Sequence, residues 1–125
     1  MTVSLLLPWP YKGLSPNARL HHMALFRAKK KARIQTKFMC LAALGDDPAA
    51  AAPLFKADRL NVRMTFIPDT RRRRDLDNLI AATKAHRDGI SDALGIDDSR
   101  FRVTYELAEQ PARPAVVRVT LEVAA

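Results

Sequence analysis

The chain has 125 residues, 48% of them hydrophobic, one cysteine (Cys40), and 21 Lys and Arg against 13 Asp and Glu, which gives a formal net charge of +8. This length and apolar content fit one domain over residues 1–125. One cysteine cannot form an internal disulfide, no Cys/His cluster offers a zinc site, and no apolar run reaches the roughly 20 residues that cross a bilayer. The apolar start lacks a basic flank and meets Pro8 and Pro10, unlike a signal peptide. We therefore exclude a secreted disulfide scaffold, a membrane span and a zinc finger, and expect a basic cytoplasmic domain.

The positive charge is concentrated in the first third of the chain. Residues 1–45 contain eight Lys and Arg and no acidic residue, whereas residues 46–125 contain thirteen of each sign. A region of one sign attracts polyanions, so we expect nucleic acid as a partner, although anionic lipid or plain solvation of a helix face would suit the same charges. The basic residues expected to contact DNA here are Lys29, Lys30, Lys31 and Arg33, with Asn17 and Arg19 in the loop before them.

The first half of the chain predicts a strand, a helix and a second strand. An apolar run over residues 3–9 is typical of a strand, and helix formers over residues 23–44 predict a helix that ends at Gly45. The Ala/Pro-rich residues 46–57 are interpreted as a surface connection. Strict alternation of apolar and polar residues over 60–66 predicts a half-buried strand.

The second half predicts one helix and two strands. The helical pattern over residues 75–94 ends at Gly95 and contains Gly89, which indicates either a bend or close packing. Alternation over residues 101–107 and 116–123 predicts two strands that pair antiparallel. The expected fold is therefore α+β, with a mixed sheet of about four strands, two helices and the order β-α-β-α-β-β.

The segment from Arg71 to Leu79, RRRRDLDNL, contains the residues with the clearest chemistry. The guanidinium groups of Arg71, Arg72, Arg73 and Arg74 bind phosphate well, but Asp75 and Asp77 would repel it. The conflict disappears if the two carboxylates hold Mg²⁺, which takes carboxylate, water and phosphate oxygens. The alternative is that one of these aspartates merely caps the helix.

Three further polar positions extend this site. Asp98, with Asp97 as a helper, stands in a turn that could return a carboxylate to the metal. Lys84 lies seven residues after Asp77, on the same face of the expected helix, from which it could contact a scissile phosphate. Asp88 could pair with Lys84 four residues before it. The combination suggests a metal-dependent phosphodiesterase.

At these residues the sequence resembles the RusA-type Holliday-junction resolvases, small endonucleases of phages and prophages. The resemblance rests on Leu7-Pro8-Trp9-Pro10, on the Arg71–Leu79 block and on Asp97-Asp98, and the loop Ser15–Arg19 is similar to one branch of the family. It implies Asp75, Asp77 and Asp98 as catalytic metal ligands and Lys84 as the catalytic lysine. The lysine matches only if three extra residues are allowed, because Ala81 stands at the ungapped position.

The resemblance implies a homodimer that resolves four-way DNA junctions by paired cuts in opposite strands, with Mg²⁺ or substituting Mn²⁺, in a bacterial or phage-infected cell. Two alternatives from the residues stay open: a non-catalytic DNA- or RNA-binding module or inactive nuclease relative, and a nuclease for flaps or other branched DNA. Trp9 and Tyr11 could stack on an unpaired base, although Trp9 could equally belong to the core.

Overall fold

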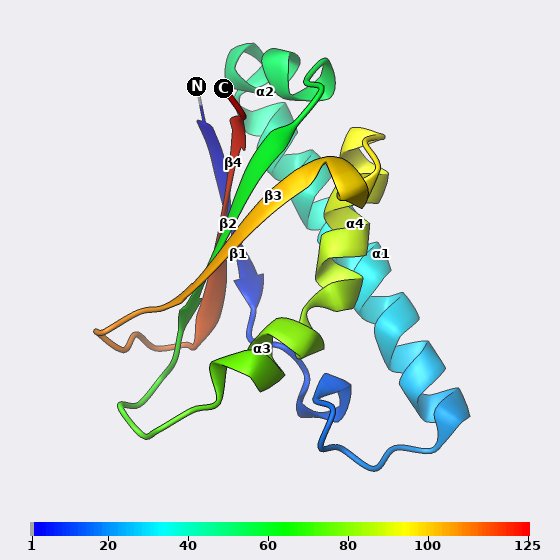
Figure 1. Cartoon of the computed structure of the whole chain (residues 1–125), viewed down its shortest axis with the longest axis vertical. Helices are drawn as coiled ribbons and strands as arrows, with labels where there is room; N and C mark the ends of the chain where they lie inside the picture. Colours follow the sequence, from blue (N-terminus) through cyan, green and yellow to red (C-terminus); the bar gives the residue numbers. More distant parts are fainter. Residues whose placement is uncertain (1) are drawn as a thin grey trace.

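The computed structural model describes residues 2–125, and it arranges them as a four-stranded sheet with helices packed against it (Figure 1). The mixed sheet and the α+β class are confirmed. None of the helices in this range combines the length and the apolar character that a membrane crossing needs. In chain order the elements are β1 (Thr2–Pro8), the 3-10 helix η1 (Lys12–Leu14), α1 (His22–Asp46), α2 (Pro48–Phe55), β2 (Leu60–Ile67), α3 (Leu76–Ala82), α4 (Lys84–Leu94), the 3-10 helix η2 (Asp98–Arg100), β3 (Phe101–Leu107) and β4 (Val116–Val123).

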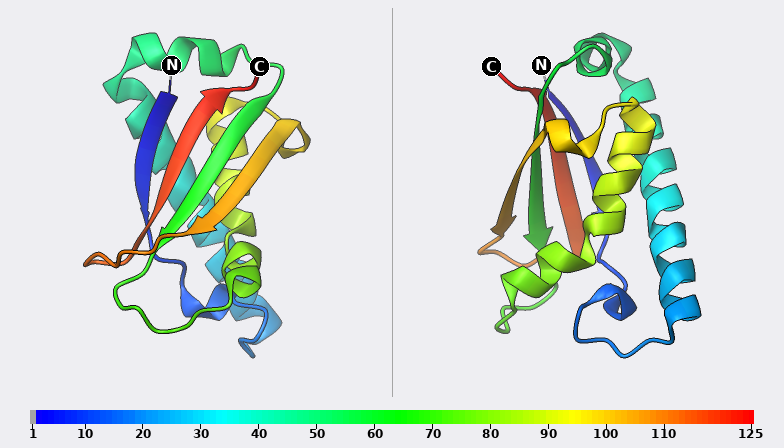
Figure 2. Two further views of the ribbon diagram at one scale, coloured as in Figure 1. Left: turned by 60° about the vertical axis from the view of Figure 1, so that its left-hand side comes forward. Right: turned by 45° about the vertical axis from the view of Figure 1, so that its right-hand side comes forward.

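The strand order is β1-β4-β2-β3, so β4 lies inside the sheet and β3 at its edge (Figure 2). β4 pairs antiparallel with both β1 and β2, whereas β3 pairs parallel with β2. The expected antiparallel pairing of β3 with β4 is therefore wrong. The helices α3 and α4 connect β2 to β3, and a helical crossover of this kind joins parallel neighbours.

Alternate residues of the strands form the core. α1 and α4 cover one face of the sheet (Figure 2), and the buried strand residues form one core cluster with residues of these helices. Trp9 packs against the edge of this core, with its ring 6.1 Å from that of Phe66 in an edge-on arrangement. Cys40 is fully buried. The fully buried strand residues are Leu7, Leu60, Val62, Met64, Phe66, Val117, Val119 and Leu121.

The chain between α1 and β2 is more helical than predicted. α1 continues through Gly45 to Asp46, and the expected surface connection contains α2. Asp47 ends α1 and begins α2, because its carboxylate accepts a hydrogen bond from the amide of Ala50 at 3.2 Å. Pro48 occupies the first position of α2, where a missing amide hydrogen does no harm.

The second predicted helix is divided at Thr83 into α3 and α4. Thr83 leaves helical geometry, and its hydroxyl donates a hydrogen bond to the carbonyl of Ile80 at 2.8 Å. The break means that Lys84 and Asp77 do not share one helix face, which corrects the expectation from their spacing. Gly89 lies inside an unbroken α4 and against α1: an added Cβ would come within 2.8 Å of Thr36 Cβ. Close packing explains this glycine.

Candidate functional site

The arginine loop between β2 and α3 is ordered by one of its own arginines. Arg74 donates hydrogen bonds to the carbonyls of Thr70 and Arg72, both at 3.1 Å, and forms an ion pair with Asp69 at 3.1 Å. Its guanidinium also lies over the Trp9 ring, 5.6 Å from the centroid. The Arg74 side chain is only 11% exposed, so its main role is to stabilise the loop.

The other arginines of the loop are exposed. Arg71 donates a hydrogen bond to the side chain of Gln110 at 2.8 Å, which ties the loop to the β3–β4 connection. Arg72 and Arg73 remain exposed to solvent. These two are the members of the run that are free to meet a phosphate.

Asp75 caps α3. Its Oδ1 accepts hydrogen bonds from the amides of Asp77 and Asn78, at 3.0 Å and 3.4 Å. This is the capping role that was the alternative to metal binding, and it occupies one of the two carboxylate oxygens. The side chain of Asp77 is exposed in the first turn of α3.

A hollow of about 260 Å³ joins the N-terminal loop to the start of α3. We call it the arginine hollow. Asp75, Arg72, Arg74 and Lys12 of η1 all line it, so one acidic and three basic residues share one concave surface. Its full lining is Trp9, Pro10, Tyr11, Lys12, Ser15, Arg72, Arg74, Asp75, Asn78, Leu79 and Ala82.

Lys84 lies between two carboxylates. Its Nζ is 2.6 Å from Oδ1 of Asp88 and 3.0 Å from Oδ2 of Asp98, and Arg87 approaches the same Asp98 oxygen at 3.4 Å. The hydrogen bond that Lys84 donates to Asp88 raises the pKa of Lys84, with a smaller contribution from the one to Asp98. The Lys84 ammonium in turn lowers the pKa of Asp98. The pairing expected between Lys84 and Asp88 is confirmed.

The three predicted metal ligands are not gathered in one place. Asp75 and Asp77 lie at the start of α3, whereas Asp98 lies in η2, and its carboxylate contacts Lys84 and Arg87 in the first turn of α4. Across residues 2–125 there is no group of three or more His, Cys, Asp or Glu side chains placed to hold a metal ion. Asp98 is instead held by the two cations of α4. Asp97, the proposed helper, caps η2 through the amide of Ser99 at 3.1 Å.

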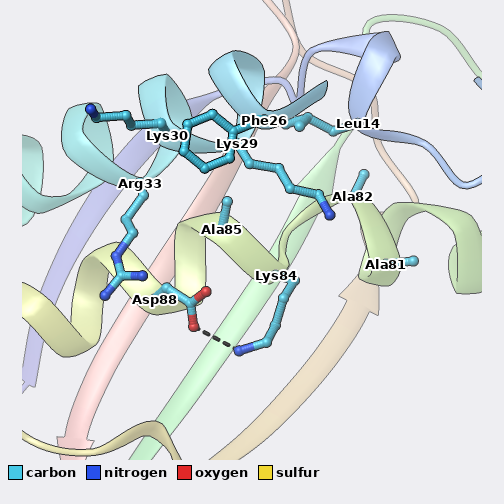
Figure 3. A pocket seen from close by; sticks show the side chains of 10 residues that line it. All are labelled: Leu14, Phe26, Lys29, Lys30, Arg33, Ala81, Ala82, Lys84, Ala85 and Asp88. Atoms are coloured by element: carbon cyan, nitrogen blue, oxygen red, sulfur yellow. Dashed lines mark hydrogen bonds and ion pairs between the residues drawn. The ribbon is translucent and has the colours of Figure 1, made fainter. Parts of the chain in front are cut away.

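The basic stretch of α1 faces two different sides. Lys29, Lys30 and Arg33 line a hollow of about 410 Å³ between α1 and α4, which we call the α1–α4 hollow (Figure 3). Lys84 and Asp88 lie across it on α4, and the exposed ring of Phe26 covers one side (Figure 3). Ala82 lines both this hollow and the arginine hollow, so the two basic surfaces adjoin.

Arg33 forms an ion pair with an acidic residue of α4 that the sequence did not indicate as its partner. Its Nε and Nη2 donate to the two carboxylate oxygens of Asp92, at 2.6 Å and 2.8 Å, in a fork-to-fork pair. These hydrogen bonds lower the pKa of Asp92. Arg33 is therefore a link between α1 and α4 as much as a candidate DNA contact. Asp92 and Arg87 were missed because their partners are distant in sequence.

The remaining predicted DNA contacts lie apart from these hollows. Lys31 is exposed on the opposite side of α1 from Lys29 and Arg33, beside Trp9 and Tyr11. Asn17 lines a shallow surface hollow next to η1, and its amide donates to the hydroxyl of Ser15 at 3.3 Å. Arg19 is exposed in the same loop.

Comparison with known proteins gives one informative match. No family model matches the chain. Over 112 residues, which make up 90% of this chain and 70% of the relative, the sequence is 45% identical to an uncharacterized protein of Xylella fastidiosa (strain Temecula1). Identity at this level over most of both chains establishes common descent, so the chain belongs to the same family as that Xylella protein.

Proposed function

We propose that the protein is a Mg²⁺-dependent endonuclease for branched DNA, and that four-way junctions are its substrate. The observation that carries the proposal is the arginine hollow, which Asp75 lines together with Arg72 and Lys12. In a groove that only bound phosphate this carboxylate would repel the ligand, and a neutral Ser or Asn could cap α3 in its place. The resemblance to RusA-type resolvases, given by the residues of this same segment, supplies the reaction class.

In this proposal the DNA backbone follows the adjoining basic surfaces. Arg72 would hold a phosphate at the arginine hollow, with the exposed Arg73 next to it in the loop, and Lys29 and Lys30 would hold phosphates at the α1–α4 hollow. Contacts of this kind position DNA without reading its sequence. Because they release counterions, binding should weaken steeply with salt.

Two carboxylates remain for the metal. The capping hydrogen bonds of Asp75 fall on Oδ1, and the Asp77 side chain is exposed. Mg²⁺ is often held by one or two carboxylates, with water and substrate phosphate completing its shell, so Asp75 and Asp77 fit this smaller set. When bound, Mg²⁺ or Mn²⁺ would neutralise the phosphate and acidify a bound water.

In this proposal Lys84 and Asp98 have roles other than binding the metal. Asp98 serves as the partner that keeps the Lys84 ammonium charged and in place, rather than as a ligand. The Lys84 side chain is 55% exposed, and it borders the α1–α4 hollow. There the ammonium can meet the negative charge of a DNA phosphate that lies between the two hollows.

The test compares a four-way junction, a flap and a plain duplex, each with Mg²⁺ and with a chelator. Wild-type protein should cut the junction in opposite strands only when Mg²⁺ is present. Asp77→Asn should keep junction binding and cut roughly a hundredfold more slowly or worse, because it loses a ligand. Asp46→Asn is the matched control, since Asp46 is exposed at the end of α1.

The same experiment separates the alternatives. The scattered positions of the three aspartates favour a non-catalytic DNA- or RNA-binding module or an inactive nuclease relative, and such a protein would bind the junction but never cut it. Faster cutting of flaps would identify a nuclease for other branched DNA. An Asp77→Asn variant that cuts at the wild-type rate would refute the metal assignment.

The proposal also includes a homodimer in the cytoplasm of a bacterial or phage-infected cell. Two coordinated cuts require two active sites, and a four-way junction has near-twofold symmetry that a C₂ dimer matches. Light scattering on the DNA-free protein should give about twice the mass of one chain. A monomer that makes single, uncoupled nicks would refute this part.

A further inference from the structure

A third hollow lies on the other side of α1 and is not used by the proposed cleavage chemistry. It has a volume of about 430 Å³ and lies between the end of β1, α1 and α4. We call it the His86 hollow. It falls within the size range of pockets that enclose small ligands. The side chains that matter for its chemistry are Trp9, Tyr11, Lys31, Gln35, Thr36 and His86.

His86 provides an unused polar group at this place. The residue is only 7% exposed, and its Nδ1 is buried with no hydrogen-bond partner among residues 2–125. Buried polar atoms nearly always have a partner, and His86 also lines the hollow, so its imidazole is a polar group that the protein leaves available to a ligand bound there. Burial lowers the pKa of His86, so the imidazole is neutral at neutral pH, with one donor and one acceptor nitrogen.

The other walls are aromatic and small. Trp9 and Tyr11 both line the hollow. The Tyr11 ring lies against Gly13, where an added Cβ would overlap it, so the backbone there supports the ring. On α1, Ala28 and Ala32 leave the space open, and Gln35 adds an amide at the rim.

These walls match a planar, nitrogen-rich ring. Aromatic side chains stack on any nucleobase, while an amide and an imidazole can satisfy the polar edge that the base exposes when it is unpaired. Lys31 is exposed at the rim, where it can meet the phosphate of the same nucleotide. The ligand that suits the hollow is therefore a single unpaired nucleotide of a nucleic acid.

The hollow adjoins the candidate active site. Trp9 and Tyr11 line both the His86 hollow and the arginine hollow that contains Asp75. A strand whose phosphate lies against Arg72 therefore passes the entrance of the His86 hollow. A base inside a continuous duplex is stacked on both sides, whereas a base next to the crossover of an opened branched structure lacks one stacking neighbour and is freed at lower cost.

We propose that the His86 hollow binds one unpaired base of the DNA substrate, stacked against Tyr11 and Trp9 and hydrogen-bonded at its edge by His86 and Gln35. This inference rests on the proposed function, because it assumes that the substrate is branched DNA. It assigns the preference for branches over plain duplex to a base-binding site, distinct from the residues proposed for cleavage.

The first experiment locates the base directly. A four-way junction with 5-iododeoxyuridine at the crossover is bound in the presence of a chelator and irradiated, and the crosslinked peptide is identified by mass spectrometry. The crosslink should fall on Trp9 or Tyr11. Ala28→Phe, which fills the hollow from the surface of α1, should abolish it while circular dichroism stays unchanged. Crosslinks confined to other segments would overturn the proposal.

The second experiment measures the contribution of the ring. Tyr11→Ala should weaken binding to a junction roughly five- to a hundredfold, the range found for loss of one base–aromatic stack, and Tyr11→Phe should bind within about twofold of wild type. Binding to plain duplex should change little in either variant. Phe55→Ala is the control, since Phe55 is an exposed aromatic at the end of α2.

The outcomes distinguish this proposal from the nuclease proposal. If the junction is crosslinked at Tyr11 but never cut with Mg²⁺, the base site stands and the nuclease fails. If the junction is cut but Tyr11→Ala and Tyr11→Phe bind it equally, the nuclease stands and the base site fails. His86→Gln adds a further check. It should change the order of affinity for junctions that carry each of the four bases at the crossover, which a loss of packing alone would not do.

Discussion

Two helical glycines of this chain should respond in opposite ways to the same substitution. Gly89 lies in α4 where it meets α1, and an added Cβ would overlap the carbonyl oxygen of Arg33 and come within 2.8 Å of Thr36 Cβ. Gly45 lies near the end of α1, and an added Cβ there would have no atom within 4 Å. The structure thus contains its own control for Gly→Ala.

The magnitudes follow from two opposing effects. Replacing a helical glycine by alanine stabilises the helix by up to about 1 kcal/mol. At Gly45 nothing opposes this gain, so Gly45→Ala should be neutral or more stable by several tenths of a kcal/mol. At Gly89 the obstacle is backbone, which moves only if α1 moves, and overpacking costs roughly 1–3 kcal/mol or more. With the upper end of this cost, about 3 kcal/mol, and the helix gain of about 1 kcal/mol, Gly89→Ala should lower the free energy of unfolding by about 2 kcal/mol.

Urea unfolding measures both effects. Trp9 is the single tryptophan and reports through its fluorescence, while circular dichroism reports on the helices. With a slope of roughly 1–3 kcal/mol per molar urea, Gly89→Ala should lower the midpoint by about 1 M, and Gly45→Ala should leave it unchanged or raise it. A Gly89→Ala protein as stable as wild type would show that α1 and α4 are not in such close contact.

Three further outcomes are expected. Burial depresses the pKa of His86, so the unfolded chain binds more protons than the folded one once the pH falls below about 6.5. The free energy of unfolding should therefore decrease as the pH is lowered from 7.5 to 5.5. Urea titrations at several pH values should show this slope, and His86→Gln should flatten it. Burial raises the pKa of Cys40 to about 11, so its thiol should react slowly with an alkylating reagent at neutral pH and rapidly in urea; fast labelling of the folded protein would contradict its burial. Arg72→Ala and Arg73→Ala should each reduce the slope of the logarithm of DNA affinity against the logarithm of salt concentration by about one unit. Arg74→Ala should mainly destabilise its loop. An unchanged slope in the first two variants would show that these arginines do not contact DNA phosphates.

The strands could be located from the sequence because alternation is a local signal. Leu60–Ile67, Phe101–Leu107 and Val116–Val123 lie within one residue of the predicted ranges. Their partners could not be predicted, because alternation marks a buried face and not a neighbour. The position of β4 between β1 and β2 depends on contacts between the two ends of the chain.

The helices show where local rules conflict. Gly45 predicted the end of α1, yet the helix continues to Asp46 and stops before Asp47, whose carboxylate caps α2. Thr83 gave no strong signal of a break, because a single β-branched residue is tolerated within helices. The break depends on burial, since Thr83 is 2% exposed and fits between helices only with its hydroxyl bonded back to Ile80.

The candidate site was predictable as a set of residue types but not as a geometry. The spacing predicted that Lys84 and Asp77 lie on one face of a single helix. In the structure the helix is broken at Thr83, and Lys84 forms ion pairs with Asp88 and Asp98. A carboxylate that already holds a lysine and an arginine is a poor metal ligand, because a cation would have to displace both. In the proposed function Asp98 therefore positions Lys84, and the metal would depend on the two aspartates at the start of α3. Since two carboxylates leave most of a Mg²⁺ shell open, the substrate phosphate itself would complete the site, and tight metal binding is expected only when DNA is present.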